Sequence, residues 1–161
     1  MTGLSGAVFS PCRSYRYVLW RTWDDKLPRV NFVGLNPSTA DEVSDDPTMR
    51  RCRRFAEHWG FGGFIMTNLF AFRATKPSDL RGAADPIGSD NDLWLTRASG
   101  EAQIVVFAWG VHGAFLGRNE VIIRQIGSGG HCIGLTKHGH PAHPLYLRNG
   151  LPLLPFPPFK P

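Results

Sequence analysis

The sequence predicts an α/β fold, a three-layer α/β/α sandwich with a central, mostly parallel sheet of about four core strands plus an N-terminal antiparallel hairpin strand. Two observations predict it. Segments of strand character alternate with segments of helical character, and four of the apolar strand segments run directly into polar residues. These four segments are 30–38, 64–69, 104–112 and 132–140.

The N-terminal strand is predicted from the aromatic and β-branched residues of 15–23. A turn at 24–28 leads to the first core strand, Val30–Gly34. Because the connection is short, we expect these two strands to form an antiparallel hairpin at the edge of the sheet.

The first helix is predicted from the residues at its two ends. Asp46 is a favourable N-cap, and Pro47 suits the first helical position, where a missing N–H costs nothing. The helix is expected to end near Trp59, before Gly60. The later predicted elements are a strand over 64–69, a helix capped by Ser89 or Asp90 and ending at Ser99, a strand over 102–108, a helix over 112–126, a turn at 127–130, the fourth core strand, a short helix at 145–148 and an extended proline-rich tail over 151–159.

The composition indicates one globular domain over 1–161. Hydrophobic residues make up 42% of the chain and charged residues 19%, which is typical of a chain that folds around a core. No apolar run approaches the roughly 20 residues needed to cross a bilayer, and the first residues do not resemble a secretory signal. A cytoplasmic location without a membrane partner is therefore expected.

The net charge bears on the class of binding partner, and the cysteines bear on disulfides and metal sites. The net charge of +5 favours a polyanionic partner, although many basic proteins bind none. Arg50, Arg53 and Arg54 share one helical face at i, i+3 and i+4 spacing, and this face either binds phosphate or is simply solvated. The three cysteines contain no CxxC pair, so neither a disulfide framework nor a structural zinc site is expected.

Two asparagines stand at the ends of predicted core strands. Asn36 follows the first of these strands in a turn with Pro37 and Ser38, and it can orient a water or bond a substrate edge. Asn68 closes the second strand, and its carboxamide offers the adjacent donor and acceptor that match a pyrimidine edge. Each asparagine can instead be a turn residue or a loop cap.

The fourth predicted strand leads into a loop, Lys137–His143, that contains three histidines. Histidine is the commonest metal ligand, but two prolines stiffen this region and no known metal-ligand spacing is present, so no metal is predicted. The preferred interpretation is a hydrogen-bond donor to a developing anion, with a solvated basic loop as the alternative. Parallel strand ends meet at one rim, so we expect the two asparagines, His112 and residues 140–143 to converge.

Acidic and aromatic residues near the same strand ends supply further candidates. Asp41 is retained as a catalytic candidate, because Asp46 is better explained as a helix cap. Phe70, Phe72 and Trp109 follow the second and third core strands. They are either core residues or a stacking surface for a base.

In their order, these motifs resemble the uracil-DNA glycosylase superfamily over roughly 30–148. Gly34–Pro37 resembles the first motif of the mismatch-specific branch, and Thr67–Arg73 is similar to a segment of the thermostable branch. Val105–Gly110 resembles the third strand of that branch, and His143–Arg148 resembles the second motif, a His-Pro followed by a short helix. The longer string from Gly34 to Thr48 resembles more closely a bacterial and phage family named only as a domain of unknown function.

The superfamily resemblance implies hydrolysis of the N-glycosidic bond of a uracil-like or modified base that is flipped into a pocket. By this resemblance, Asn36 would position water against the sugar C1′, and His143 would stabilise negative charge on the leaving base. Asp41 would be a further catalytic group. The residues expected to contact the base are Asn68, Phe70, Pro37, Ser38 and Trp109, and those expected to hold phosphate or nucleic acid are Arg50, Arg73, Lys137 and His140.

Several positions depart from the superfamily pattern. Ser38 stands where the mismatch-specific branch has glycine, and Asn36 is not the aspartate of the fastest branch, which predicts slow or specialised chemistry. Phe72 stands where the thermostable branch has a cysteine ligand of its iron–sulfur cluster, so no cofactor is expected. Leu145 and Tyr146 replace the usual Ser-Pro that enters the minor groove, which argues against double-stranded DNA as the substrate.

Three functions remain open at this point. The first is a DNA glycosylase, the second is a nucleotide-, nucleoside- or RNA-directed hydrolase of the same fold, and the third is a non-catalytic nucleic-acid-binding module. The expected partner is DNA or a nucleotide, and the chain is expected to be a monomer. Salt dependence would separate polymer from nucleotide ligands, because each phosphate contact adds to the slope.

Overall fold

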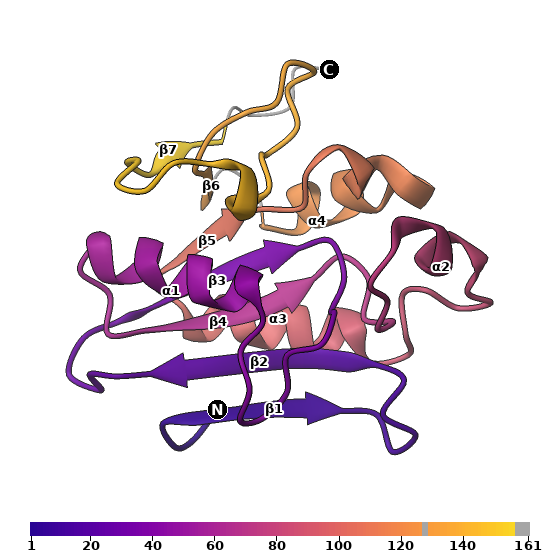
Figure 1. Cartoon of the computed structure of the whole chain (residues 1–161), viewed down its shortest axis with the longest axis horizontal. Coiled ribbons are helices and arrows are strands. Elements are labelled where there is room, and N and C mark those ends of the chain that lie inside the picture. The colour runs from indigo at the N-terminus through magenta and orange to yellow at the C-terminus, as the bar shows by residue number, and fades with distance from the viewer. Residues whose placement is uncertain (127–128, 157–161) are drawn as a thin grey trace.

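The structure is a computed structural model, and it describes residues 1–126 and 129–156. These residues form a seven-stranded sheet with helices around it (Figure 1). The strands are β1 (Ser5–Phe9), β2 (Arg16–Thr22), β3 (Arg29–Gly34), β4 (Gly63–Asn68), β5 (Ile104–Phe107), β6 (Gly130–Cys132) and β7 (Leu154–Pro155). The helices are α1 (Pro47–His58), α2 (Pro77–Gly82), α3 (Asn91–Glu101) and α4 (Arg118–Ile126), with the 3-10 helices η1 (Val111–Gly117) and η3 (Pro144–Tyr146).

The strand order is β1-β2-β4-β3-β5-β6-β7. The four central strands, β4, β3, β5 and β6, pair in parallel. The pairs β1–β2, β2–β4 and β6–β7 are antiparallel. The sheet is therefore mixed, which corrects the prediction of a mostly parallel sheet. The α/β class and the presence of four core strands are as expected, but the fourth, β6, begins at Gly130, inside the predicted turn, and ends at Cys132.

The predicted N-terminal hairpin is wrong in its pairing. The strand expected over 15–23 exists as β2, but β4 lies between it and β3, and Leu19 of β2 pairs with Met66 of β4. The edge hairpin is formed by β1 and β2 instead. β1 is not among the predicted strands because its sequence, Ser-Gly-Ala-Val-Phe, begins with residues of low strand propensity.

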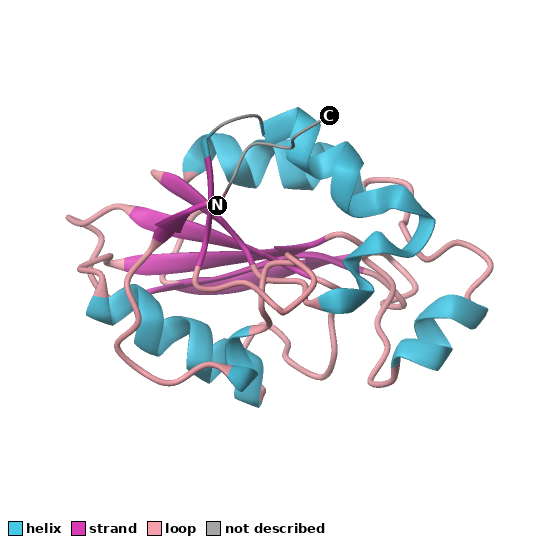
Figure 2. Cartoon of the chain, turned by 90° about the horizontal axis from the view of Figure 1, so that it is seen from above, coloured by secondary structure: helices cyan, strands magenta, loops and turns pink. Residues whose placement is uncertain are grey.

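Helices lie on both faces of the sheet (Figure 2). On one face, Met49 and Phe55 of α1 pack in a cluster with Phe32 of β3. On the other face, Leu95 of α3 and residues of α4 pack in a cluster with Phe107 of β5. Each such side chain contributes about 1.5–3 kcal/mol by leaving water, so the two clusters fix how the helices and strand ends lie relative to one another.

Helix α1 begins and ends as the sequence predicts. The side chain of Asp46 accepts a hydrogen bond from the N–H of Met49 at 2.9 Å, and Pro47 occupies the first turn. The helix ends at His58, and Gly60 has a φ of 82°, a left-handed conformation that favours glycine. Both ends depend on interactions between residues close in sequence, so they can be predicted without the tertiary structure.

Other predicted elements differ in detail. The helix predicted over 112–126 is two helices, η1 and α4, and Leu116, near the end of η1, has a φ of 54°. The short helix predicted at 145–148 is η3, which begins one residue earlier and ends two residues earlier, and part of the tail forms β7. Positions 127–128 of the predicted turn and 157–159 of the predicted tail lie outside the described residues. No helix in 1–126 or 129–156 is long and apolar enough to span a membrane.

Candidate functional site

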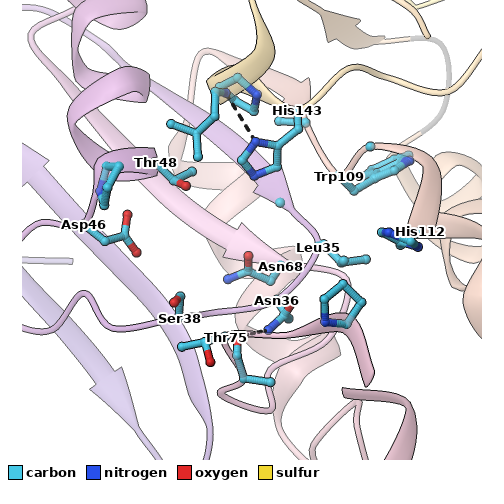
Figure 3. A pocket seen from close by; sticks show the side chains of 18 of the residues that line it. Leu35, Asn36, Ser38, Asp46, Thr48, Asn68, Thr75, Trp109, His112 and His143 are labelled. Atoms are coloured by element: carbon cyan, nitrogen blue, oxygen red, sulfur yellow. Dashed lines mark hydrogen bonds between the residues drawn. The ribbon is translucent and has the colours of Figure 1, made fainter. Parts of the chain in front are cut away.

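A pocket of about 470 Å³ opens at the carboxyl ends of the four parallel strands (Figure 3). Its lining comes from the loops that follow β3, β4 and β5, from the segment after β6, and from the start of α1. From β3 the chain runs to β4 on one side and later returns to β5 on the other, so the strand order reverses at β3. Open α/β sheets bind ligands at such a reversal.

Four predicted residues line this pocket from four different strand ends: Asn36, Asn68, His112 and His143. In Figure 3 the side chains of Asn36, Asn68 and His143 border one common space, with Asp46 on its far side from His112. The parallel strands thus bring two carboxamides and two imidazoles together from across the chain.

The carboxamide of Asn36 is held by two backbone carbonyls. Its Nδ2 donates to the carbonyl oxygen of Ala74 at 2.8 Å and to that of Pro37 at 3.0 Å. Both partners only accept, so the amide nitrogen must face them. Oδ1 of Asn36 has no hydrogen-bond partner among residues 1–126 and 129–156, and it is a fixed acceptor in the pocket lining.

Asn68 is a buried wall of the pocket, with only 3% of its surface exposed. The chain around it is held by Asn91, whose Nδ2 donates to the carbonyls of Asn68 and Leu69 at 3.1 and 3.0 Å. The Nδ2 of Asn68 itself has no partner within the described part of the chain. An unsatisfied buried donor costs about 1–3 kcal/mol, so this group is one that a ligand acceptor would complete.

His143 is oriented by its own backbone. It precedes η3, and its Nδ1 accepts the N–H of Leu145 at 3.3 Å (dashed in Figure 3). A ring nitrogen that accepts is unprotonated, so the neutral ring carries its proton on Nε2. Burial lowers the pKa of His143 below 6.5, although Asp46 opposes this shift. At pH 7 the ring is therefore neutral, with Nε2–H as a donor.

Asp41 does not line the pocket. Its carboxylate accepts the N–H groups of Val43 and Ser44 at 2.9 and 2.7 Å, and these bonds lower the pKa of Asp41. This is the pattern of an aspartate that closes a turn on its own backbone. The geometry therefore gives the catalytic assignment of Asp41 no support.

Two of the three aromatic candidates are core residues in the structure, and the third, Phe72, is partly buried. Phe70 is fully buried and packs with its ring centroid 5.3 Å from that of Phe115, so it presents no face to a ligand. Trp109 borders the pocket but is only 1% exposed, and its ring packs 4.6 Å from Phe107. The core alternative that the sequence leaves open therefore describes both residues.

The predicted phosphate-binding residues lie outside the pocket lining. Arg50 donates through Nη1 to the carbonyl of Asp45, and Arg73 donates to that of Arg13 at 3.2 Å. The loop 135–141 folds back on itself through backbone bonds. The predicted site residues absent from the lining are Pro37, Asp41, Phe70, Arg50, Arg73, Lys137 and His140, whereas Ser38 is part of it.

Arg16 lines the pocket and is not among the predicted site residues. The β1–β2 register shifts here, so that Phe9 pairs with Arg16 and Tyr17 is passed over. Such a bulge re-aims the next side chain. Nη1 of Arg16 reaches the carbonyl of Ala40 at 2.8 Å, on the α1 side of the sheet. Strict strand alternation from Val18 would have placed Arg16 on the α3 side.

Residues at the start of α1 also line the pocket, although the sequence analysis gives them no role in the site. Asp46 is the helix cap that the sequence predicts, and the same side chain borders the pocket with Thr48 (Figure 3). The segment Asp46–Thr48 therefore begins the helix and also forms part of the pocket lining. Among the residues that the structure describes, no group of three His, Cys, Asp or Glu side chains could hold a metal ion.

No curated protein and no solved structure matches the chain. A family model does match, from Arg16 to Leu145, and this range contains every residue of the pocket lining except Tyr146. Because the match covers more than half of the sequence, the chain belongs to the family described as "Protein of unknown function (DUF1643)", over residues 16–145.

Proposed function

We propose that the chain hydrolyses the N-glycosidic bond of a uracil-like or modified base in a nucleic acid, as a DNA glycosylase does. The observation that carries the proposal is one juxtaposition in the pocket. Asn36, Asn68 and His143 border the same space, and each retains a polar atom without a protein partner in the described residues. An acceptor and two donors are what hydrolysis of a nucleoside needs at its water, its base edge and its leaving group.

In this mechanism Asn36 positions the nucleophile. Its Oδ1 accepts a hydrogen bond from a water molecule and directs that water toward C1′ of the sugar. The new bond joins the water oxygen to C1′, and the C1′–N bond breaks with its electron pair going to the base. The proton that the water loses is balanced by the proton that the base gains, so the net reaction adds one water across the bond.

His143 and Asn68 act on the base. Negative charge develops on the leaving base, and the neutral His143 ring donates its Nε2–H to that charge. Asn68 donates Nδ2–H to a carbonyl on the base edge, a bond that removes the cost of its unsatisfied amide. The base reaches both groups only when it leaves its stack and enters the pocket.

The rim of the pocket supports a nucleic-acid ligand. Tyr146 is 87% exposed beside His143, with their ring centroids 5.7 Å apart, and it offers an aromatic face for stacking. Lys76 also lines the pocket. Aromatic rings and cations that share one surface are typical of proteins that hold single strands.

The test is base release from oligonucleotides that carry uracil, 5-hydroxymethyluracil, thymine opposite guanine, hypoxanthine or xanthine, in single- and double-stranded form. We expect release of at least one base by the wild-type chain and release at least about 100-fold slower by Asn36→Ala, which controls for a contaminating glycosylase. If no substrate loses its base, the hydrolase proposal is wrong, and binding without turnover would leave a binding module.

Gly34→Ala tests whether Asn68 takes part. A Cβ at Gly34 would lie 2.7 Å from Oδ1 of Asn68, so the carboxamide must turn away. We expect kcat/KM for base release to fall by roughly 10- to 100-fold, because a displacement near 1 Å in a positioned group has that effect. The matched control is Gly100→Ala on α3, where a Cβ meets nothing within 4 Å. Equal activity in the two variants would remove Asn68 from the mechanism.

A further inference from the structure

Arg16 is a buried cation beside the pocket. It is 1% exposed, and it lines the same pocket as Asn36 and His143. Nη1 donates to the carbonyl of Ala40 at 2.8 Å, while Nε is buried without a partner among the described residues. A guanidinium has five N–H donors, so most of its hydrogen-bonding capacity is unused.

The carboxylates near Arg16, those of Asp46 and Asp41, raise its pKa through space but make their hydrogen bonds elsewhere. Asp46 accepts the N–H of Met49 at 2.9 Å, and Asp41 accepts two backbone N–H groups of its own turn. No ion pair joins Arg16 to an acid in the described ranges. Burial lowers the pKa of Arg16 to about 10, so the group remains charged at neutral pH.

A second arginine of β2 shows the contrast. Arg21 is also buried and reaches the same loop, where it pairs with Asp45 at 2.9 Å and donates to the carbonyls of Trp20 and Asp41. Each of its three nitrogens has a partner. Arg21 does not line the pocket. Of these two arginines, the one left with free donors is therefore the one at the pocket.

We propose that Arg16 binds a phosphate of the substrate, so that the pocket takes a phosphorylated nucleotide unit and not a free nucleoside or base. A planar guanidinium matches phosphate oxygens with paired N–H donors. An anion at this position also removes the cost of an unpaired buried charge. The hydroxyls of Ser38, Thr39 and Thr48 line the same pocket and add donors to such a group.

This inference rests on the proposed function only for the nucleotide part of the ligand. The test is therefore binding, without turnover, by calorimetry. The probes are pseudouridine 5′-monophosphate and pseudouridine, whose carbon–carbon glycosidic bond cannot be hydrolysed, together with inorganic phosphate. A DNA pentamer with one central deoxypseudouridine distinguishes a phosphate within a strand from a terminal phosphate.

We expect the wild-type chain to bind the monophosphate or the pentamer at least about 30-fold more tightly than pseudouridine, since losing one partner of a buried charge pair has an effect of this size. Arg16→Met should abolish that preference, and Arg16→Lys, which keeps the charge, should retain part of it. Arg29→Met is the matched control. Like Arg16, Arg29 donates to one backbone carbonyl, that of Met1, but it lies at the start of β3, at the end of the strand away from the pocket.

Two results would overturn the assignment of Arg16. One is equal affinity of the wild-type chain for pseudouridine and both phosphorylated probes. The other is an unchanged phosphate preference in Arg16→Met, or, if that variant does not fold, a preference in Arg16→Lys equal to that of the wild type. Base release without a phosphate preference would refute this inference alone, whereas an Arg16-dependent preference without base release would refute the proposed hydrolysis alone.

Discussion

Asn36→Ala is expected to lower kcat for base release by roughly 100- to 1,000-fold, the loss typical of removing one preorganised polar group from an active site. In the proposed mechanism, Oδ1 of Asn36 is the acceptor that directs water toward C1′, and alanine has no such acceptor. Nδ2 of Asn36 also ties its loop to Ala74, so the fold must be checked by circular dichroism and thermal unfolding. The kinetic measurement is single-turnover base release at saturating enzyme.

Asn36→Asp tests the assigned orientation of the Asn36 carboxamide. An aspartate here would direct an anionic oxygen at the carbonyls of Pro37 and Ala74, which now accept from Nδ2. We therefore expect Asn36→Asp to be slower than the wild type and less stable. Asn119→Ala on α4, outside the pocket lining, should behave as the wild type. A faster Asn36→Asp variant would contradict the assigned orientation of the carboxamide.

His143→Ala is the second large effect, with an expected loss of about 100- to 1,000-fold in kcat, since it removes one donor to the leaving group. KM should change little if the bond forms chiefly in the transition state. His143→Gln offers an amide N–H in a similar place and should recover part of the rate. His58→Gln, an exposed histidine in the last turn of α1, is the control. Full activity of His143→Ala would refute the role of the ring.

The pH dependence follows from the same residue. Burial lowers the pKa of His143 below 6.5, so the ring becomes protonated only under acidic conditions. A protonated Nδ1 would then point its N–H at the N–H of Leu145, which it now accepts. We expect kcat to fall as the pH drops through the lowered pKa of His143 in the wild type, and this acidic limb to be absent in His143→Gln. A limb that persists in His143→Gln would belong to another group.

Stability should respond to pH in the same direction. Because the folded-state pKa of His143 is lowered, the unfolded chain binds the proton more readily between the two pKa values. The contribution of His143 to stability is therefore fully present above pH 6.5. It is lost as the pH falls through the lower, folded-state pKa. The loss of melting temperature between pH 7 and pH 5 should be smaller in His143→Gln than in the wild type.

Much of the site can be predicted from the sequence because its residues lie where strands end. Asn36, Asn68, His112 and His143 each follow an apolar strand segment, and parallel strands place their carboxyl ends on one rim. The start of α1 can also be predicted, since Asp46 accepts a hydrogen bond from an N–H only three residues away. Both signals are local, and the parallel pairing of the core strands makes the local signals converge.

Other features depend on contacts between distant parts of the chain. The pairing of β2 with β4 is a choice between two neighbours of similar composition, and only the packed sheet makes it. Whether Phe70 is core or surface is likewise decided by Phe115, which packs on it from 45 positions along the chain. Residue type alone favours neither alternative at such positions.

The α/β class, the ends of α1 and the four strand ends that surround the pocket can be predicted from local sequence signals, because periodicity, capping and turn chemistry act over a few residues. The mixed order of the sheet and the residues that complete the pocket depend on contacts between segments that are far apart in the chain. Arg16 is the clearest case. A register shift between β1 and β2 turns its side chain to the α1 side of the sheet, and its hydrogen-bond partner there, the carbonyl of Ala40, comes from a loop 24 residues further along the chain.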